Sequence, residues 1–234
     1  MRAFKYAIVA VLTLTSIAKT APLSEADLKN LLAAIRQNRT TQADFQERRV
    51  IRLMKNPVLS SGTVWFQPPN KFRREVKGNS PSVTVSDGRE LWIYYPNFKS
   101  AERYPLGKGS PLDATVAAIN SALNLENIET SFNISATKSD TGHALALLPR
   151  TGAMKRVFQK LDLRINDKFR VEGTDMLLPN GDRIVTTYSN QTRAPIPPST
   201  FEFKPPTGTE VTTPLGNEGS KERAAKLAGI FNPP

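Results

Sequence analysis

Residues 58–96 decide the fold: VLSSGTVWFQPPNKFRREV (58–76) is followed, after a short polar break, by SVTVSDGRELWIYYP (82–96). In each half, two runs that alternate apolar and polar side chains flank a tight polar connection. The first connection is Gln67–Asn70, which contains two prolines, and the second is Ser86–Gly88. Proline fixes φ at about −65° and Asp-Gly tolerates a positive φ, so both connections are typical of hairpin turns. The stretch therefore predicts two consecutive β-hairpins.

Large apolar side chains occur on both faces of these strands. Val64 and Phe66 share one face of the first hairpin while Trp65 lies on the other, and residues 90–95 repeat this alternation. A sheet has to bury each apolar face against another layer. A protein of this size with two such faces needs two covers, or one cover and a ligand.

Two amphipathic helices are predicted outside these hairpins. Ser24 can cap a helix that runs to about Arg36, because Asp27 stands three residues further on as in a capping box. The second helix is expected over 111–124, with Pro111 at its first position after Ser110. Both helices carry one apolar stripe. The stripes consist of Leu28, Leu31, Leu32 and Ile35 in the first helix, and of Val116, Ile119, Ala122 and Leu123 in the second.

The rest of the chain reads as short strands joined by turns. A strand over 41–53, with Phe45, Ile51 and Leu53 on one side, precedes the hairpins, and a short strand over 101–104 completes a meander of about six. Further strands are expected at 132–136, 144–148, 157–165, 169–175, 183–188 and 200–203. The short connections imply that neighbours in sequence are neighbours in the sheet. The predicted class is α+β, with ten or eleven antiparallel strands.

The N-terminus has the pattern of a secretory signal peptide. Arg2 and Lys5 precede an apolar run, and Ser16 and Ala18 give the small-x-small pattern of a cleavage site after residue 18. An uncleaved anchor is the alternative, but the run falls short of the ~20 residues of a spanning helix. We expect export from the cytoplasm, one domain over residues 22–212 and a polar tail over 213–234. The sequence contains no cysteine, so a packed core has to stabilise the exported protein.

The net charge of +11 leaves two interpretations open. A basic protein is attracted to anionic surfaces such as phospholipid head groups. Alternatively, the charge belongs to an ordinary surface of mixed sign. Nucleic acid is not expected as a partner, because the chain is predicted to leave the cytoplasm and its basic residues are dispersed.

The sequence is poor in groups that do chemistry. His143 is the only histidine and falls in a predicted turn, where a solvated side chain is expected and not a general base. Glu47 and Arg49 read as surface residues. Cysteine is absent and no His or acidic cluster has metal-ligand spacing. We therefore expect no enzyme, no cofactor and no metal, and keep a hydrolase built on His143 as a remote alternative.

Apolar surface is in excess of what two short helices can cover. The uncovered part would form a concave apolar site of the kind that takes an acyl chain. Each methylene buried from water contributes about 0.8 kcal/mol, so such a chain would be held by its length. The competing interpretation is that these side chains pack only against one another and the helices.

Three segments resemble a known family. SSGTVWFQPPNKFR, TVSDGRELWIYYP and TFEFKPPTGTEV are similar to segments of the LolA-like periplasmic carriers of outer-membrane lipoproteins, and the likeness spans residues 23–211. The resemblance implies an unclosed antiparallel β-barrel with the amphipathic helices as a lid over the concave apolar face. It further implies a monomer that takes lipoprotein acyl chains, or a related lipid, from an inner-membrane release complex and passes them to an outer-membrane receptor.

The resemblance also assigns the candidate site. Phe45, Val64, Phe66 and Phe72 match inward-facing positions, and alternation from Phe72 places Arg74 inward as well. With the neighbouring strand and the helix stripes, the expected lipid-binding residues are Leu28, Leu32, Phe45, Val64, Phe66, Phe72, Leu91, Ile93, Val116 and Ile119.

One departure concerns release of the cargo. Carriers of this family have a basic residue just before the Pro-Asn turn, linked to control of the lid, and here that position is Pro68. Either another cation takes this part, with Arg74 the nearest inward candidate, or the lid is controlled differently. The second functional hypothesis is an envelope sensor that uses the same cavity to regulate a membrane partner.

Overall fold

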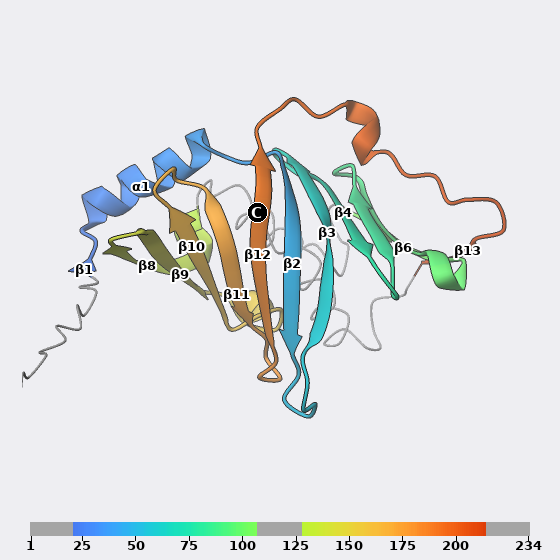
Figure 1. Cartoon of the computed structure of the whole chain (residues 1–234), viewed down its shortest axis with the longest axis horizontal. Helices are drawn as coiled ribbons and strands as arrows, with labels where there is room; N and C mark the ends of the chain where they lie inside the picture. The colour runs from blue at the N-terminus through green and yellow to red at the C-terminus, as the bar shows by residue number, and fades with distance from the viewer. Residues whose placement is uncertain (1–20, 107–127, 214–234) are drawn as a thin grey trace, which may run out of the picture.

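The computed structural model describes residues 21–106 and 128–213, which form one large sheet with a few helices (Figure 1). The first part contains β1 (Ala21–Pro22), α1 (Glu25–Gln37), β2 (Gln42–Val50), β3 (Val58–Gln67), β4 (Lys71–Lys77), β5 (Ser82–Ser86), β6 (Glu90–Tyr95), the 3-10 helix η1 (Pro96–Phe98) and β7 (Ser100–Pro105). The second contains α3 (Ile128–Ser131), β8 (Phe132–Ser139), β9 (Gly142–Pro149), α4 (Gly152–Lys155), β10 (Lys160–Asn166), β11 (Val171–Leu177), β12 (Arg183–Thr192), the 3-10 helix η2 (Pro198–Phe201) and β13 (Glu210–Thr212).

The sheet consists of two meanders that meet at β2 and β12. Its strand order is β1-β8-β9-β10-β11-β12-β2-β3-β4-β5-β6-β7-β13, and all neighbours are antiparallel except β13, which runs parallel to β7. Its two end strands do not pair with each other, so the sheet is unclosed, as expected. The expected ten or eleven strands correspond to β2–β12, and the additional strands are the two-residue β1 and the three-residue β13 at the edges.

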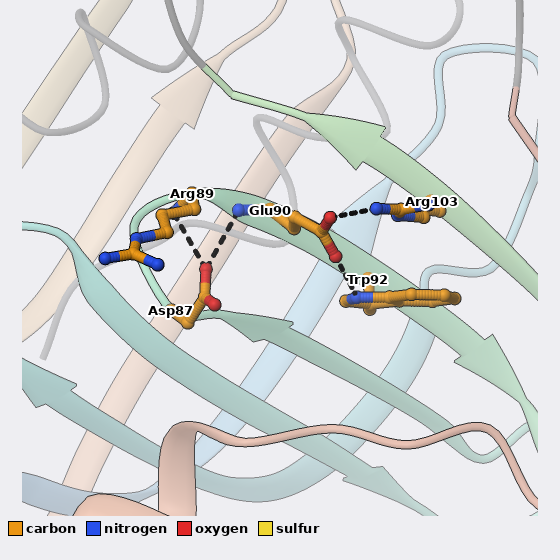
Figure 2. Close-up of polar contacts among 5 residues, drawn as sticks. All are labelled: Asp87, Arg89, Glu90, Trp92 and Arg103. Carbon is orange, nitrogen blue, oxygen red and sulfur yellow. Dashed lines mark hydrogen bonds and ion pairs between the residues drawn. The ribbon is translucent and has the colours of Figure 1, made fainter.

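Both predicted hairpins are present. In the second, hydrogen bonds of two acidic side chains fix the turn around Asp87-Gly88 (Figure 2). Asp87 Oδ1 accepts hydrogen bonds from the backbone N–H groups of Arg89 (2.7 Å) and Glu90 (2.9 Å), while Gly88 adopts a φ of +92°. The Glu90 carboxylate in turn accepts from Trp92 Nε1 at 3.1 Å and forms an ion pair with Arg103 on β7. This network closes the turn and holds Trp92 on the outer face.

The inner face of the sheet carries the main core. Cross-strand partners Phe66 and Phe72 lie at 2% and 1% exposure, and the second meander contributes leucines from β9 and β10 to the same cluster. Helix α4 and the residues that follow it add Met154, Val157 and Phe158 to the cluster. A strand had been predicted from residue 157, but β10 begins only at Lys160. The inner face is therefore lined from both meanders.

Helix α1 packs against this inner face and is tied down at both ends. Ser24 caps it by accepting from the Asp27 N–H, and its buried stripe joins the inner-face cluster. Before the helix, Leu23 N–H donates to Ala136 O on β8 at 2.9 Å. After it, Arg193 donates to Gln37 O at 2.8 Å. Helix α1 thus packs on the face over which the lid was expected. The second predicted helix (111–124) lies outside the described residues.

Part of the outer face, at β4 and β6, is covered by the C-terminal segment, which runs from β12 to β13 (Figure 1). Phe203 lies with its ring centroid 5.6 Å from those of both Trp92 and Tyr94. Arg73 on β4 donates to Thr200 O at 3.1 Å, and Phe201 is 1% exposed. The prediction of a strand over 200–203 was wrong, because this segment begins as η2 and continues irregularly. The C-terminal segment therefore supplies one of the two covers that the sheet needs.

Strand β2 ends earlier than predicted. It stops at Val50, and Leu53 lies in the following turn with 97% of its surface exposed. No helix in the described part of the chain is long and apolar enough to cross a membrane.

If the C-terminal segment is a structural cover, Phe201→Ala should destabilise the protein by about 3–5 kcal/mol, the usual cost of emptying a buried phenylalanine site. The matched control is Phe98→Ala, because Phe98 is 80% exposed and its truncation should change stability by no more than about 0.5 kcal/mol. Urea unfolding of both variants measures the difference. Equal stability of the two variants would contradict this role of the segment.

Candidate lipid-binding interior

The structure brings the described candidate residues together in one cluster on the inner face. Leu28 is partly buried and packs against the cluster. The other seven are at most 3% exposed: Leu32, Phe45, Val64, Phe66, Phe72, Leu91 and Ile93. Val116 and Ile119 lie outside the described residues. Alternation separated the two faces and the resemblance assigned the inner one, in agreement with the structure, where neither Trp65 nor Trp92 belongs to the cluster.

The aromatic wall depends on close approach between strands. Phe66 pairs with Phe72, which pairs with Ser86, and Ser86 pairs with Leu91, so these inward residues form one row from β3 to β6. Phe45 lies opposite Gly62, where an added Cβ would stand 2.9 Å from the Phe45 ring and 1.8 Å from the Glu75 carbonyl oxygen. Only glycine lets the Phe45 ring lie over this strand.

A buried ion pair crosses the apolar wall. Arg74 is inward, as alternation predicted, and its Nη2 lies 2.9 Å from Glu47 Oε2, with both side chains 8% exposed or less. The guanidinium carbon also lies 4.2 Å from the centroid of the Phe45 ring, a cation–π distance. The interpretation of Glu47 as a surface residue was wrong. The signal was available, because Glu47 stands two residues after Phe45 on the same face of β2.

Hydroxyl groups extend this polar spot along the inner face. Thr186 pairs with Glu47 and Thr174 pairs with Thr186, and both threonines are at most 1% exposed. Burial raises the pKa of Tyr188 well above its usual value, an effect that the nearby Arg74 charge opposes. Burial also lowers the pKa of Arg74, against the attraction of Glu47. The interior thus combines hydrocarbon walls with one internally neutralised polar band.

A second cation lies where α1 leaves the inner face. The Arg39 guanidinium stands 5.6 Å from the centroid of the Phe66 ring, one residue beyond the C-cap Asn38 of α1. Sequence reasoning did not single out Arg39, because only the fold places it beside Phe66. Pro68, at the position of the family's basic residue, lies in the turn between β3 and β4.

His143 packs against an aromatic side chain of the sheet. Its ring stacks on Phe169 at a centroid distance of 6.0 Å, and burial lowers its pKa. The side chain is half-buried in β9, not solvated in a turn as predicted. Within residues 21–106 and 128–213, no group of three His, Cys, Asp or Glu side chains could hold a metal ion.

The chain matches the model of a known protein family over most of this interior. The model of the outer membrane lipoprotein carrier protein LolA matches residues 36–204, which include β2–β12 and most of the inner face. The chain belongs to the LolA family. Its described candidate residues from Phe45 to Ile93 all fall inside the matched region.

Relatives in sequence agree over most of the chain. A protein of Dechloromonas aromatica named outer-membrane lipoprotein carrier protein is 27% identical over 179 residues, covering 76% of this chain and 83% of that protein. A Chromohalobacter salexigens protein of the same name is 25% identical over 212 residues, covering 90% and 98%. The crystal structure of an uncharacterized conserved Thermus thermophilus protein shares the fold, with a TM-score of 0.50 at 15% identity, over 80% of this chain and 99% of that one.

The buried pair makes a direct stability prediction. Glu47→Gln strands the Arg74 charge and Arg74→Met strands the Glu47 carboxylate, so each change should cost about 3–5 kcal/mol. The double variant should cost much less than the sum, because neither charge is then left alone. Urea unfolding of the parent, the two single variants and the double variant measures the coupling between the two side chains.

The exposed pair Lys160–Asp162, with the same N···O distance of 2.9 Å, is the matched control. Its disruption by Asp162→Asn should cost about 1 kcal/mol or less. Additive single costs at Glu47 and Arg74 would show that the two side chains are not coupled.

Proposed function

We propose that this protein is a periplasmic carrier that holds lipoprotein acyl chains between the sheet and α1. The observation that carries the proposal is the inner-face cluster, in which the buried stripe of α1 is continuous with the aromatic wall of β2–β6. Helix α1 covers apolar surface of the sheet through the packing of its apolar side chains. Acyl chains can make the same contacts, at about 0.8 kcal/mol per methylene.

The family supports the choice of cargo. The matching family model and the relatives carry the name of outer-membrane lipoprotein carriers. We infer that this chain likewise accepts acylated proteins from an inner-membrane release complex and delivers them to an outer-membrane receptor as a monomer. These names favour a carrier over an envelope sensor. We assign it no catalytic role and no cofactor.

The organisation of the chain fits this route. We propose that residues 1–18 direct export and are removed, that residues 22–212 form the lipid-binding domain, and that residues 213–234 are a polar tail. The described helices leave the domain without a membrane-spanning candidate. A carrier that travels between two membranes needs an aqueous compartment, and the periplasm provides it.

Entry of cargo requires α1 to separate from the sheet. The wall residues Phe45, Phe66 and Phe72 are at most 3% exposed and share one cluster with the α1 stripe, so an acyl chain reaches them only by displacing side chains of that cluster. The backbone bonds of Leu23 and the contact at Gln37 hold the two ends of α1 during this exchange. Because helix and cargo bury the same surface, occupancy is decided by a small difference in free energy, which suits a carrier.

The Arg74–Glu47 pair gives the interior one polar point. A diacylated cysteine carries ester carbonyls, which are acceptors that a guanidinium can bind. We place these groups near the Arg74–Glu47 pair and the acyl chains along the Phe66–Phe72 row. Pro68 cannot supply the cation that the family uses before the Pro-Asn turn, so charge at the lid must come from elsewhere, and Arg39 stands at the end of α1.

The proposal predicts that Phe72→Glu weakens binding of a fluorescent diacylated lipopeptide at least about tenfold. A carboxylate in an apolar site costs several kcal/mol unless it protonates or reaches water, so acyl chains would no longer be accepted there. Fluorescence titration measures the affinity, and circular dichroism confirms that the variant is folded.

Leu148→Glu is the matched control, because Leu148 is 45% exposed on β9 and its new carboxylate would face solvent. It should bind the lipopeptide like the parent protein. A folded Phe72→Glu variant with parental affinity would overturn the proposed site. A variant that cannot fold would make Phe72 a core residue and not an acyl contact.

A further inference from the structure

The tip of the β2–β3 hairpin presents an unusual apolar surface. All eight residues from Arg52 to Leu59 are exposed. Four of them are large apolar side chains: Leu53 (97%), Leu59 (72%), Met54 (52%) and Val58 (46%). The other exposed large apolar residues of the described chain, Phe98, Leu148 and Val211, stand singly on η1, β9 and β13. Single exposed apolar residues are normal, but a contiguous group indicates an interaction site.

The hairpin tip is held in an ordered conformation. Arg52 N–H donates to Asp182 Oδ1 in the β11–β12 turn at 3.1 Å, and Met54 N–H donates to Ile51 O at 3.0 Å. Figure 1 shows this hairpin projecting beyond the sheet at the end opposite α1. The apolar side chains are therefore presented outward by a braced turn.

The hairpin segment around the tip carries basic side chains and no acidic ones. Arg48, Arg52 and Lys55 are exposed next to the apolar group, and residues 48–59 contain no acidic side chain. Asp182 of the β11–β12 turn adds one carboxylate beside the tip, which accepts the Arg52 backbone hydrogen bond. Apolar side chains ringed by Lys and Arg match the boundary between anionic head groups and acyl chains.

We propose that the β2–β3 tip, residues 52–59, docks the protein on an anionic phospholipid bilayer. Leu53 and Leu59 enter the head-group boundary, and Arg52 and Lys55 bind lipid phosphates. The tip is convex and small, whereas a stable protein interface needs about 800 Å² on each partner. A bilayer needs only side chains that reach about 5–10 Å into its surface. This docking does not involve the inner-face cluster, so it stands or falls independently of the proposed acyl site.

Vesicle flotation tests the proposal on the full chain expressed with its own N-terminus and purified from the periplasmic fraction. Vesicles of phosphatidylglycerol and phosphatidylethanolamine should bind the protein, and binding should weaken as salt is raised because the Debye length shortens. Pure phosphatidylcholine vesicles should bind it at least about tenfold less, since they lack the anionic surface.

Two pairs of variants separate the apolar and charged contributions. Leu53→Ser with Leu59→Ser should weaken binding at least about tenfold, whereas the control Phe98→Ser should bind like the parent. Arg52→Gln with Lys55→Gln should weaken binding roughly tenfold or more and reduce its salt dependence. Lys168→Gln, in the exposed β10–β11 turn at the other end of β11, is the charge control.

The absence of cysteine from the sequence allows a direct measurement of insertion. An environment-sensitive fluorophore on Leu53→Cys should shift its emission to the blue when anionic vesicles are added. The same fluorophore on Phe98→Cys should not respond. Thermal unfolding of each variant should match the parent, because these side chains are exposed.

Three results would overturn the proposal. The first is that the parent protein fails to bind anionic vesicles, and the second is that the Leu53/Leu59 variant binds them unchanged. The third is binding only to native membranes that is lost after protease treatment, which would assign the tip to a protein partner. The Leu53/Leu59 variant should keep the lipopeptide affinity of the parent. If the parent protein does not bind the lipopeptide, that result contradicts the carrier function alone.

Discussion

The pairing of β12 with β2 is the interaction on which the rest of the structure depends. It joins two meanders, which would otherwise be separate sheets, and sets Tyr188 beside Phe45 and Thr186 beside Glu47. Each meander alone would expose its apolar inner face. Joined, they build one continuous inner wall that contains a polar band between its two halves.

The two faces of this sheet are covered in different ways, and the difference has a functional consequence. Phe201 and Phe203 reach the outer face on a segment that continues into β13, so this cover is fixed along its length. The inner face is covered in part by α1, whose ends are held by few bonds while its middle contributes only side-chain packing. Helix α1 therefore lies on the face where a ligand is proposed.

The sequence predicted most of this arrangement because local patterns decide it. Alternation sorted Phe66 and Phe72 from Trp65, and the Ser24 cap located α1. The irregular cover of the outer face was not predicted, because Phe201-x-Phe203 shows the alternation of a strand. The prolines around it lack the N–H groups that pair in a sheet, so no strand forms there. The Glu47–Arg74 pair also escaped, since these residues lie on strands that β3 separates and only their three-dimensional placement brings them to 2.9 Å. Alternation extended the predicted strand to Leu53, although the chain turns there.

The inner face is proposed to carry acyl cargo in the cell. Native mass spectrometry of the protein, isolated from its own periplasm without detergent, can detect such cargo. We expect a population whose mass exceeds that of the chain by an acylated protein or a lipid, and that loses this mass on denaturation. A single species with the bare mass of the chain, which also fails to take up a diacylated lipopeptide, would contradict it.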